Sequence, residues 1–133
     1  MRFRRITIIQ APVPNERDVN EQLQWLGGSL GLFSARDKDK SCFRIFITLL
    51  KCARQQEELS SDELAERTGL SRGTVVHHLN NLIATGLVES YRSRYLLRVG
   101  HLEQLLHELE QDLDKTLAAM RDVAADIDRK MGP

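Results

Sequence analysis

The sequence of 133 residues predicts a mainly α-helical fold with one small β-hairpin and a long C-terminal helix. Apolar residues recur at helical spacing in several segments, two short β-prone runs flank a polar tip near residue 92, and the C-terminal segment repeats one apolar stripe. This length suits a single compact domain with an extension. We divide the chain into an N-terminal strand or arm with a helix (1–34), a central domain (35–100) and a terminal helix (101–133).

The composition is that of a globular protein, with 41% hydrophobic and 29% charged residues. No stretch approaches the roughly 20 apolar residues of a membrane-spanning helix, and no secretory segment is recognised, so we expect a cytoplasmic protein without a membrane partner. Cys42 and Cys52 form no CxxC pair, and we expect two reduced thiols.

The N-terminal region combines a β-prone start with a first helix. Residues 1–9 are β-prone and are followed by Pro12 and Pro14, which predicts a short strand or an arm. Asp18 can cap a helix whose apolar face recurs at three- and four-residue spacing, and this helix can break at Gly27.

The next helix, 41–56, is apolar on two sides. Phe43, Phe46, Ile47 and Leu50 form one stripe, and Ile45, Leu49 and Cys52 form a second stripe opposite to it. Asp39 or Ser41 can cap its start. Because both sides are apolar, both must be covered, one by the protein's own core and the other by the N-terminal segment, the C-terminal helix or a second subunit.

Two further helices lie between residues 59 and 85. Ser60 or Ser61 precedes two acidic residues and can cap the first helix, which ends at Gly69. Ser71 can cap the second helix, which Gly86 ends. The buried stripe of this second helix is expected to consist of Val75, Leu79, Leu82 and Ile83.

A hairpin and a long helix complete the chain. The runs LVESY and RYLLRV within 87–99 surround a tight basic connection. After Gly100, one helical stripe is formed by Leu102, Leu106, Leu109, Leu113, Leu117, Met120, Ala124, Ile127 and Met131. A lone helix with such a stripe would expose it to water along half its length, so this helix needs a partner.

The order helix, helix, turn with glycine, helix and hairpin resembles a winged helix-turn-helix domain of the type found in ArsR-like regulators and, second, in MarR-like regulators. The residues that carry the resemblance are SSDELAERTGLSRGTVVHHLNNLIATGLV, from Ser60 to Val88. The resemblance implies that helix 71–85 enters the DNA major groove and that the wing, 87–99, approaches a phosphate or the minor groove. It also implies that the long terminal helix helps to form a two-fold dimer.

The expected recognition helix has the right chemistry for base contacts on the side away from its aliphatic stripe. Asparagine pairs with adenine, histidine and arginine donate to guanine, and the start of a helix suits a phosphate. Four arginines and one acid lie between Arg72 and Gly100, so a chain of zero net charge can still present a cationic surface. The DNA-binding residues are therefore predicted to be Ser71, Arg72, Thr74, His77, Asn80, Asn81, Arg92 and Arg94.

His78, Arg98 and the N-terminal arginines are not among the predicted DNA-binding residues. His78 lies beside the buried stripe and is expected to pack at the flank of the helix. Arg98 belongs to the same basic stretch as the wing. The basic residues Arg2, Arg4 and Arg5 can form an arm that reaches a DNA groove, or they can simply be solvated.

The sequence therefore predicts a sequence-specific DNA-binding transcription regulator that acts as a symmetric homodimer and reads an inverted repeat. Repression is the expected output. The predicted dimer interface consists of Ile45, Leu49, Leu102, Leu106, Leu109, Leu113, Leu117, Met120 and Ile127.

Other functions are compatible with parts of the same sequence. A winged helix that only binds proteins fits the zero net charge, and it would bind its partner without the salt dependence of DNA binding. A metal-sensing repressor would need a site built from His101, His107 and the neighbouring Glu103 or Glu110 across a dimer. No phosphate-binding glycine loop, nucleophile elbow or HExxH motif occurs, so no enzyme, cofactor or metal is expected. The sequence does not identify an effector.

Overall fold

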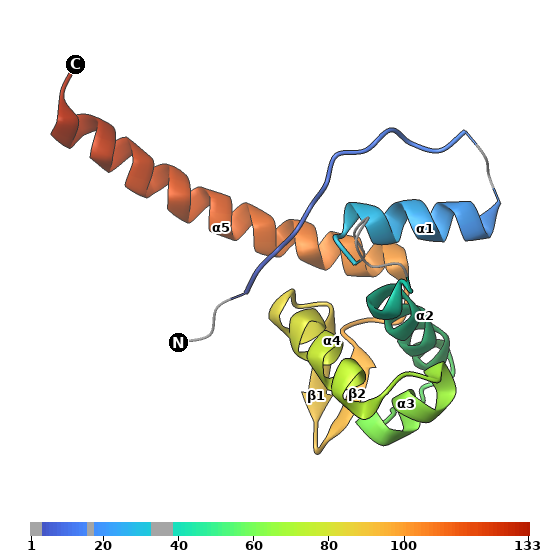
Figure 1. The fold of residues 1–133 in the computed structure, drawn as a ribbon. Coiled ribbons are helices and arrows are strands. Elements are labelled where there is room, and N and C mark those ends of the chain that lie inside the picture. Colours follow the sequence, from blue (N-terminus) through green and yellow to red (C-terminus); the bar gives the residue numbers. More distant parts are fainter. Residues whose placement is uncertain (1–3, 16–17, 33–38) are drawn as a thin grey trace.

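The computed structural model describes residues 4–15, 18–32 and 39–133, and its fold is a winged helix-turn-helix with a long C-terminal helix (Figure 1). The elements are α1 (Val19–Ser29), α2 (Ser41–Arg54), α3 (Ser61–Thr68), α4 (Arg72–Ala84), β1 (Val88–Tyr91), β2 (Arg94–Leu97) and α5 (Leu102–Met131). The predicted mainly α-helical fold class is thus confirmed. Among these residues, no helix combines the length and the apolar character that a bilayer crossing requires.

Helix α2 lies at the centre of the core. It packs against α3, α4 and β2, and the residues of both predicted stripes are buried except Ile47, which is half-buried. The expectation that both sides of this helix are covered is confirmed, and the cover comes from the same chain. The observed cap differs from the expected one: the N-cap residue is Lys40, in a left-handed conformation (φ 50°), and it makes no side-chain capping hydrogen bond.

Helices α3 and α4 meet through a three-residue turn. The Ser60 side chain accepts a hydrogen bond from the backbone N–H of Glu63, and the Glu63 carboxylate accepts one from the backbone N–H of Ser60, which is a capping box. Gly69 ends α3 with a φ of 71°, a conformation that disfavours any residue with a Cβ atom. Leu64 and Val75 then bury the inner faces of the two helices against the core.

The wing is an antiparallel hairpin with a two-residue turn. Val88 pairs with Leu97 at its base and Tyr91 pairs with Arg94 at its tip. Leu59 adds a third, single-residue pairing to Tyr95, with N–O distances of 2.8 and 3.3 Å. This bridge was not predicted from the sequence, because a single paired residue cannot show the alternation of apolar and polar residues that indicates a strand.

Residues 4–15 form an arm, not a strand. The backbone N–H of Arg5 donates to the Ala84 carbonyl at the end of α4, and that of Ile9 donates to the Ser29 carbonyl at the end of α1. Helix α1 itself begins at the predicted cap, Asp18, and continues through Gly27 to Ser29, so the expected break is absent. Arg2 lies outside the described residues.

Helix α5 packs on the core only through its first turns and then extends away from the rest of the chain (Figure 1). Leu105 and Leu109 are its buried residues, whereas Leu106, Met120 and Ile127 are exposed. Leu105 was not on the predicted stripe.

Three residues of the predicted dimer interface lie in the core of the single chain. Ile45 is 0% exposed, Leu49 is 1% exposed and Leu109 is 5% exposed. They cannot contact a second copy while this fold is kept, so their placement in the interface is corrected. The prediction was wrong for these residues because apolar spacing shows that a face is buried. It does not show whether the same chain or a second copy buries it.

Candidate nucleic-acid interface

Helix α4 exposes the side that the sequence predicts. Val75, Leu79 and Leu82 are buried in the core. The exposed residues of the helix are Arg72, Gly73, Val76, His77, Asn80, Asn81 and Ala84. His77, Asn80 and Asn81 lie opposite the buried stripe, and Arg72 is exposed in the first turn of the helix. We call the surface made by these exposed residues the α4 face. It offers amide, imidazole and guanidinium groups, which are the groups that read base edges in the major groove.

Val76 belongs to the α4 face but was missed by the sequence reading. Its side chain is 36% exposed. It adjoins Val75 in the chain, and two consecutive valines gave no reason to separate a core residue from a surface one. An exposed valine methyl group can contact the methyl group of thymine.

The start of α4 is organised by its cap. The Ser71 Oγ accepts a hydrogen bond from the backbone N–H of Thr74 at 3.2 Å and donates one to the Thr74 Oγ1 at 2.8 Å. Ser71 is exposed and Thr74 is half-buried. The two hydroxyl groups therefore fix the first turn, and they lie at the positive end of the helix, where an anion is favoured.

The two histidines of α4 differ in exposure. His77 is exposed and His78 is half-buried, which confirms the expected flanking position of His78. Their rings lie edge to face with centroids 5.3 Å apart. His77 is therefore the histidine that belongs to the α4 face.

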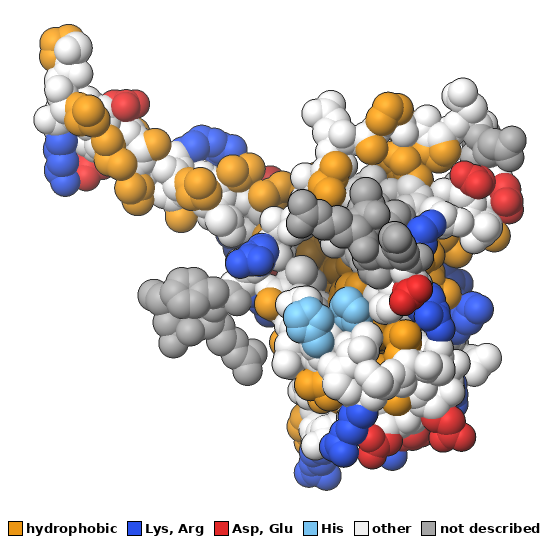
Figure 2. Space-filling model, viewed as in Figure 1, with side chains coloured by type: hydrophobic (Ala, Val, Ile, Leu, Met, Phe, Trp, Pro, Cys, Tyr) orange, Lys and Arg blue, Asp and Glu red, His pale blue; other side chains and the backbone are white. Residues whose placement is uncertain are grey.

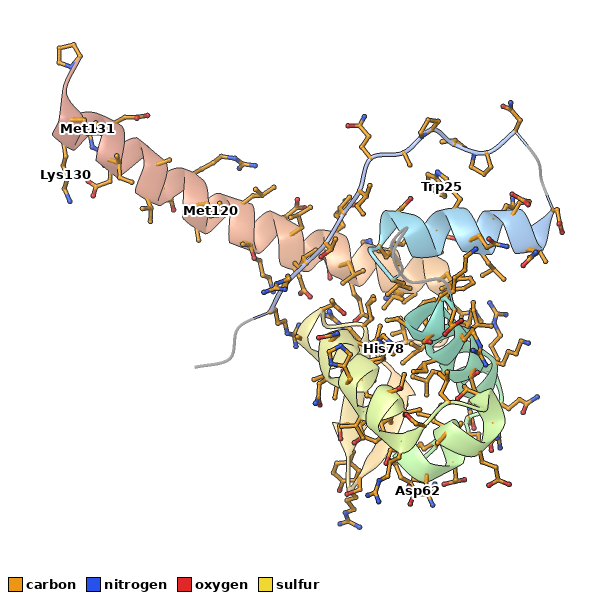
Figure 3. The ribbon with its side chains drawn as sticks, in the orientation of Figure 1. Trp25, Asp62, His78, Met120, Lys130 and Met131 are labelled. Atoms are coloured by element: carbon orange, nitrogen blue, oxygen red, sulfur yellow. The ribbon has the colours of Figure 1, made fainter. Side chains whose placement is uncertain are left out.

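Arg72 forms an ion pair with Asp62 of α3, with the Arg72 Nε 3.4 Å from the carboxylate. Both side chains are 73% exposed. Such exposed pairs contribute at most about 1 kcal/mol, so a phosphate can replace Asp62 as the partner of Arg72 at small cost. Figure 3 shows Asp62 on α3, at the same end of the domain as the wing.

Arg92 lies at the tip of the wing. It has a φ of 51° and Ser93 has a φ of 63°, as a two-residue hairpin turn requires. The Arg92 guanidinium lies 5.2 Å from the centre of the Tyr91 ring. Arg92 and Tyr91 are both exposed, so the tip presents a cation supported by an aromatic ring.

Arg94 has a structural role that the sequence did not reveal. Its Nη1 donates to the Glu58 carbonyl and to the Glu63 carboxylate, each at 3.1 Å. The Glu63 pKa is lowered, first by the hydrogen bonds from Ser60 and then by the nearby Arg94. Arg94 therefore ties the wing to the start of α3, and its side chain is still 49% exposed. Figure 2 shows basic and acidic side chains mixed at this lower end of the molecule.

Arg98 does not belong to the candidate DNA-binding surface, although the sequence places it in the basic stretch. Its side chain is 18% exposed and pairs with Glu108 at 2.7 Å and with Asp112 at 2.5 Å. Asp112 also pairs with Arg4 of the arm at 3.3 Å. These arginines join the wing and the arm to α5, so Arg72, Arg92 and Arg94 are the cations of the predicted site.

The remaining candidate groups do not form a metal or redox centre in the described part of the chain. No three His, Cys, Asp or Glu side chains there come together in a way that could hold a metal ion. Cys42 and Cys52 are thiols that form no disulfide bond among the described residues. Cys52 is buried, and this burial is the main reason that its pKa is raised.

Comparison with known proteins agrees with this geometry. Residues 39–91 match a family model described as a helix-turn-helix domain. The match spans α2, α3, the turn, α4 and β1, and therefore includes the whole α4 face. A search among curated proteins found no match. The match supports a helix-turn-helix fold for this part of the chain. Residues 39–91 are a helix-turn-helix domain, set in a winged helix-turn-helix fold.

Proposed function

We propose that the chain is a sequence-specific DNA-binding transcription regulator and that α4 is its recognition helix. The observation that carries this proposal is the α4 face. Its polar side chains are exposed, and the opposite side of the same helix is buried in the core. A rigid helix with exposed amide and imidazole groups can enter the major groove and present these groups to base edges.

The residues divide into two roles. His77, Asn80 and Asn81 can hydrogen-bond to bases, because they lie along the middle of the exposed side of α4. Arg72 and the capped start of α4 suit a phosphate, as does Arg92 at the wing tip. These phosphate contacts position the protein on the duplex, and base contacts provide its sequence preference.

The proposal includes a symmetric homodimer that reads an inverted repeat. Leu106, Met120, Ile127 and Met131 are apolar and exposed on α5, and Val123 adds to them. Figure 2 shows a row of hydrophobic side chains along the projecting part of this helix. A second copy would cover that row and place two α4 helices on one duplex. We also propose that the chain represses transcription by occupying a promoter and that it is related to ArsR-like regulators.

Selection of bound fragments from random duplex DNA tests the proposal. The wild-type chain is expected to enrich one sequence with two-fold symmetry. On that sequence, replacing His77 and Asn81 together by alanine should reduce the preference over a scrambled duplex by roughly tenfold or more, because base contacts are worth about 1–3 kcal/mol each.

A matched variant separates base contacts from phosphate contacts. Arg92→Ala should weaken binding to the selected and the scrambled duplex by the same factor and lower the dependence on salt by about one ion. If the wild-type chain enriches no sequence and binds no duplex at ~50 mM salt, the DNA proposal is wrong. Salt-insensitive binding of a protein partner by the same chain would then favour the protein-binding winged helix.

A further inference from the structure

We propose that two copies of the chain pair antiparallel through residues 106–131 of α5, in one register that places Asp114 of each copy beside Arg121 of the other. This inference rests on the homodimer proposed above and gives its geometry.

The free part of α5 has the seam of a coiled coil. From Leu113 to Met131, the apolar positions follow at spacings of four, three, four, three and four residues. The seam consists of Leu113, Leu117, Met120, Ala124, Ile127 and Met131. A seven-residue repeat of this kind is what two helices need to pack side by side over several turns. Met120 and Met131, labelled in Figure 3, mark the middle and the end of the seam.

The C-terminal part of this seam is not covered by the described part of the chain, whereas Leu113 and Leu117 are half-buried. Met120 is 59% exposed, Ile127 is 48% exposed and Met131 is 79% exposed. Leu106, seven residues before the first seam residue Leu113, is also exposed. The arm and the core cover only the first part of the helix, so a partner must cover the rest.

The charged residues beside the seam distinguish the two possible directions. Asp114, Arg121 and Asp128 lie on one flank of the seam, seven residues apart. Asp114 and Arg121 are exposed and take part in none of the ion pairs recorded for the described residues. Flanking charges of this kind set the orientation of paired helices.

A parallel pair leaves these charges without opposite partners. In a parallel coiled coil, a residue on this flank meets the residue five positions earlier on the other helix. Asp114 would then meet Leu109, Arg121 would meet Thr116 and Asp128 would meet Val123. The parallel direction therefore gives no attraction between the flanks.

An antiparallel pair gives attraction in the register that overlaps the seam over its full length. A shift of two heptads also brings Arg121 opposite Asp128 of the second copy, but it leaves only the last turns of α5 in contact. When Leu117 packs on Met120 of the second copy, Asp114 meets Arg121 of that copy, and the two-fold symmetry makes this pair twice. Shifting the helices by one heptad either way brings Asp114 opposite its own copy, or Arg121 opposite its own copy, and both arrangements repel.

The favoured register also covers the exposed Leu106, because Met131 of the second copy lies opposite to it. The two-fold axis then passes near residues 118 and 119, about 20 Å along the helix from Leu105, where α5 contacts the core. The two Leu105 residues, where α5 contacts each core, are therefore about 40 Å apart along the paired helices.

Charge exchange between two variants tests this arrangement. Asp114→Arg places two arginines together in its own dimer, and Arg121→Glu places a glutamate beside an aspartate. Each variant alone should self-associate roughly tenfold more weakly than the wild type at ~50 mM salt, because exposed pairs are worth up to about 1 kcal/mol each. Mixed together, the two variants should form a heterodimer with nearly wild-type affinity, because both of its pairs are opposite in charge.

Asp122→Arg is the matched control, since Asp122 is exposed on the side of α5 away from the seam. It should leave self-association unchanged. Sedimentation of the single variants and of their mixture measures all three expectations. Equal association of every variant, or no gain on mixing, overturns the antiparallel register.

A distance measurement gives a second, independent result. Spin labels at Asp128→Cys, in a chain whose half-buried thiol is removed by Cys42→Ala, should be about 28 Å apart in the antiparallel dimer and about 10 Å apart in a parallel one. A dimer with the short distance overturns this inference and leaves the proposed homodimer standing. A wild-type chain that remains monomeric at every concentration overturns both, whereas an antiparallel dimer that binds no DNA overturns only the DNA-binding proposal.

Discussion

Arg98 shows how one side chain joins three parts of the molecule. It leaves the end of the wing, lies half-buried and donates to Asp112 and Glu108 on α5, while Arg4 of the arm reaches the same Asp112. The hydrogen bonds from Arg98 are the main reason that the pKa of Asp112 is lowered. The orientation of α5 relative to the wing therefore depends on a charged contact.

This contact predicts a stability that depends on pH. Because the Asp112 pKa is lower in the folded chain than in the unfolded chain, the unfolded chain binds more protons in acid, and the free energy of unfolding falls as the pH drops below about 4. Asp112→Asn should lower the free energy of unfolding at pH 7 by about 1 kcal/mol and make its acid dependence shallower. Urea unfolding between pH 7 and pH 3 measures both effects.

Asp122→Asn is the control for this experiment, because Asp122 lies on the same helix but is exposed, lies away from the seam and takes part in none of the ion pairs of the described residues. It should not change the acid dependence. If Asp112→Asn behaves like this control, the contact with Arg98 does not contribute to stability.

At the level of elements, the sequence predicts the ends and the buried side of α4 but few of the contacts between α4 and its neighbours. Capping residues, glycines and apolar spacing are local signals, and they place the ends of α3, α4 and the hairpin within one or two residues. They cannot predict that Arg94 reaches back to Glu58 and Glu63, because these residues are more than thirty positions apart. Nor could they show that Ile45 and Leu49 face the chain's own core.

The wing turn gives a prediction at this level. Ser93 adopts a positive φ that costs a residue with a Cβ atom about 1 kcal/mol. Ser93→Gly should therefore raise the free energy of unfolding by about that amount and leave DNA affinity unchanged, since Arg92 is retained. Arg92→Asn should also be tolerated by the turn but should weaken DNA binding.

Urea unfolding and a mobility-shift titration on the same two variants separate stability from binding. A loss of stability in Ser93→Gly would mean that the turn does not hold Ser93 in a left-handed conformation. Equal DNA affinity of Arg92→Asn and the wild type would remove the wing tip from the interface.

For the whole molecule, the burial of Leu109 changes which residues should be substituted to test dimer formation. A charge at Leu109 would disrupt the core, because this residue is buried within one chain. Met120 and Ile127 are exposed and lie beyond the core. Replacing both by glutamate should produce a folded monomer, and its affinity for an inverted repeat should fall by at least a hundredfold because only one half-site contact remains per molecule.

The control replaces Ala118 and Ala125 by glutamate, since both are exposed, are also seven residues apart and lie off the seam. This variant should remain a dimer with wild-type DNA affinity. Light scattering and far-UV circular dichroism measure mass and helix content together. A dimer after replacement of Met120 and Ile127 would exclude the α5 seam as the interface.

The central claim is that the α4 face binds a DNA duplex, and the salt dependence of that binding tests it most directly. The affinity of the full chain for its selected duplex should fall steeply between ~50 mM and ~200 mM salt, while the preference over a scrambled duplex is kept by the wild type and lost when His77 and Asn81 are both alanine. A chain that binds neither duplex at ~50 mM salt, or whose sequence preference survives the loss of these two side chains, would contradict the claim.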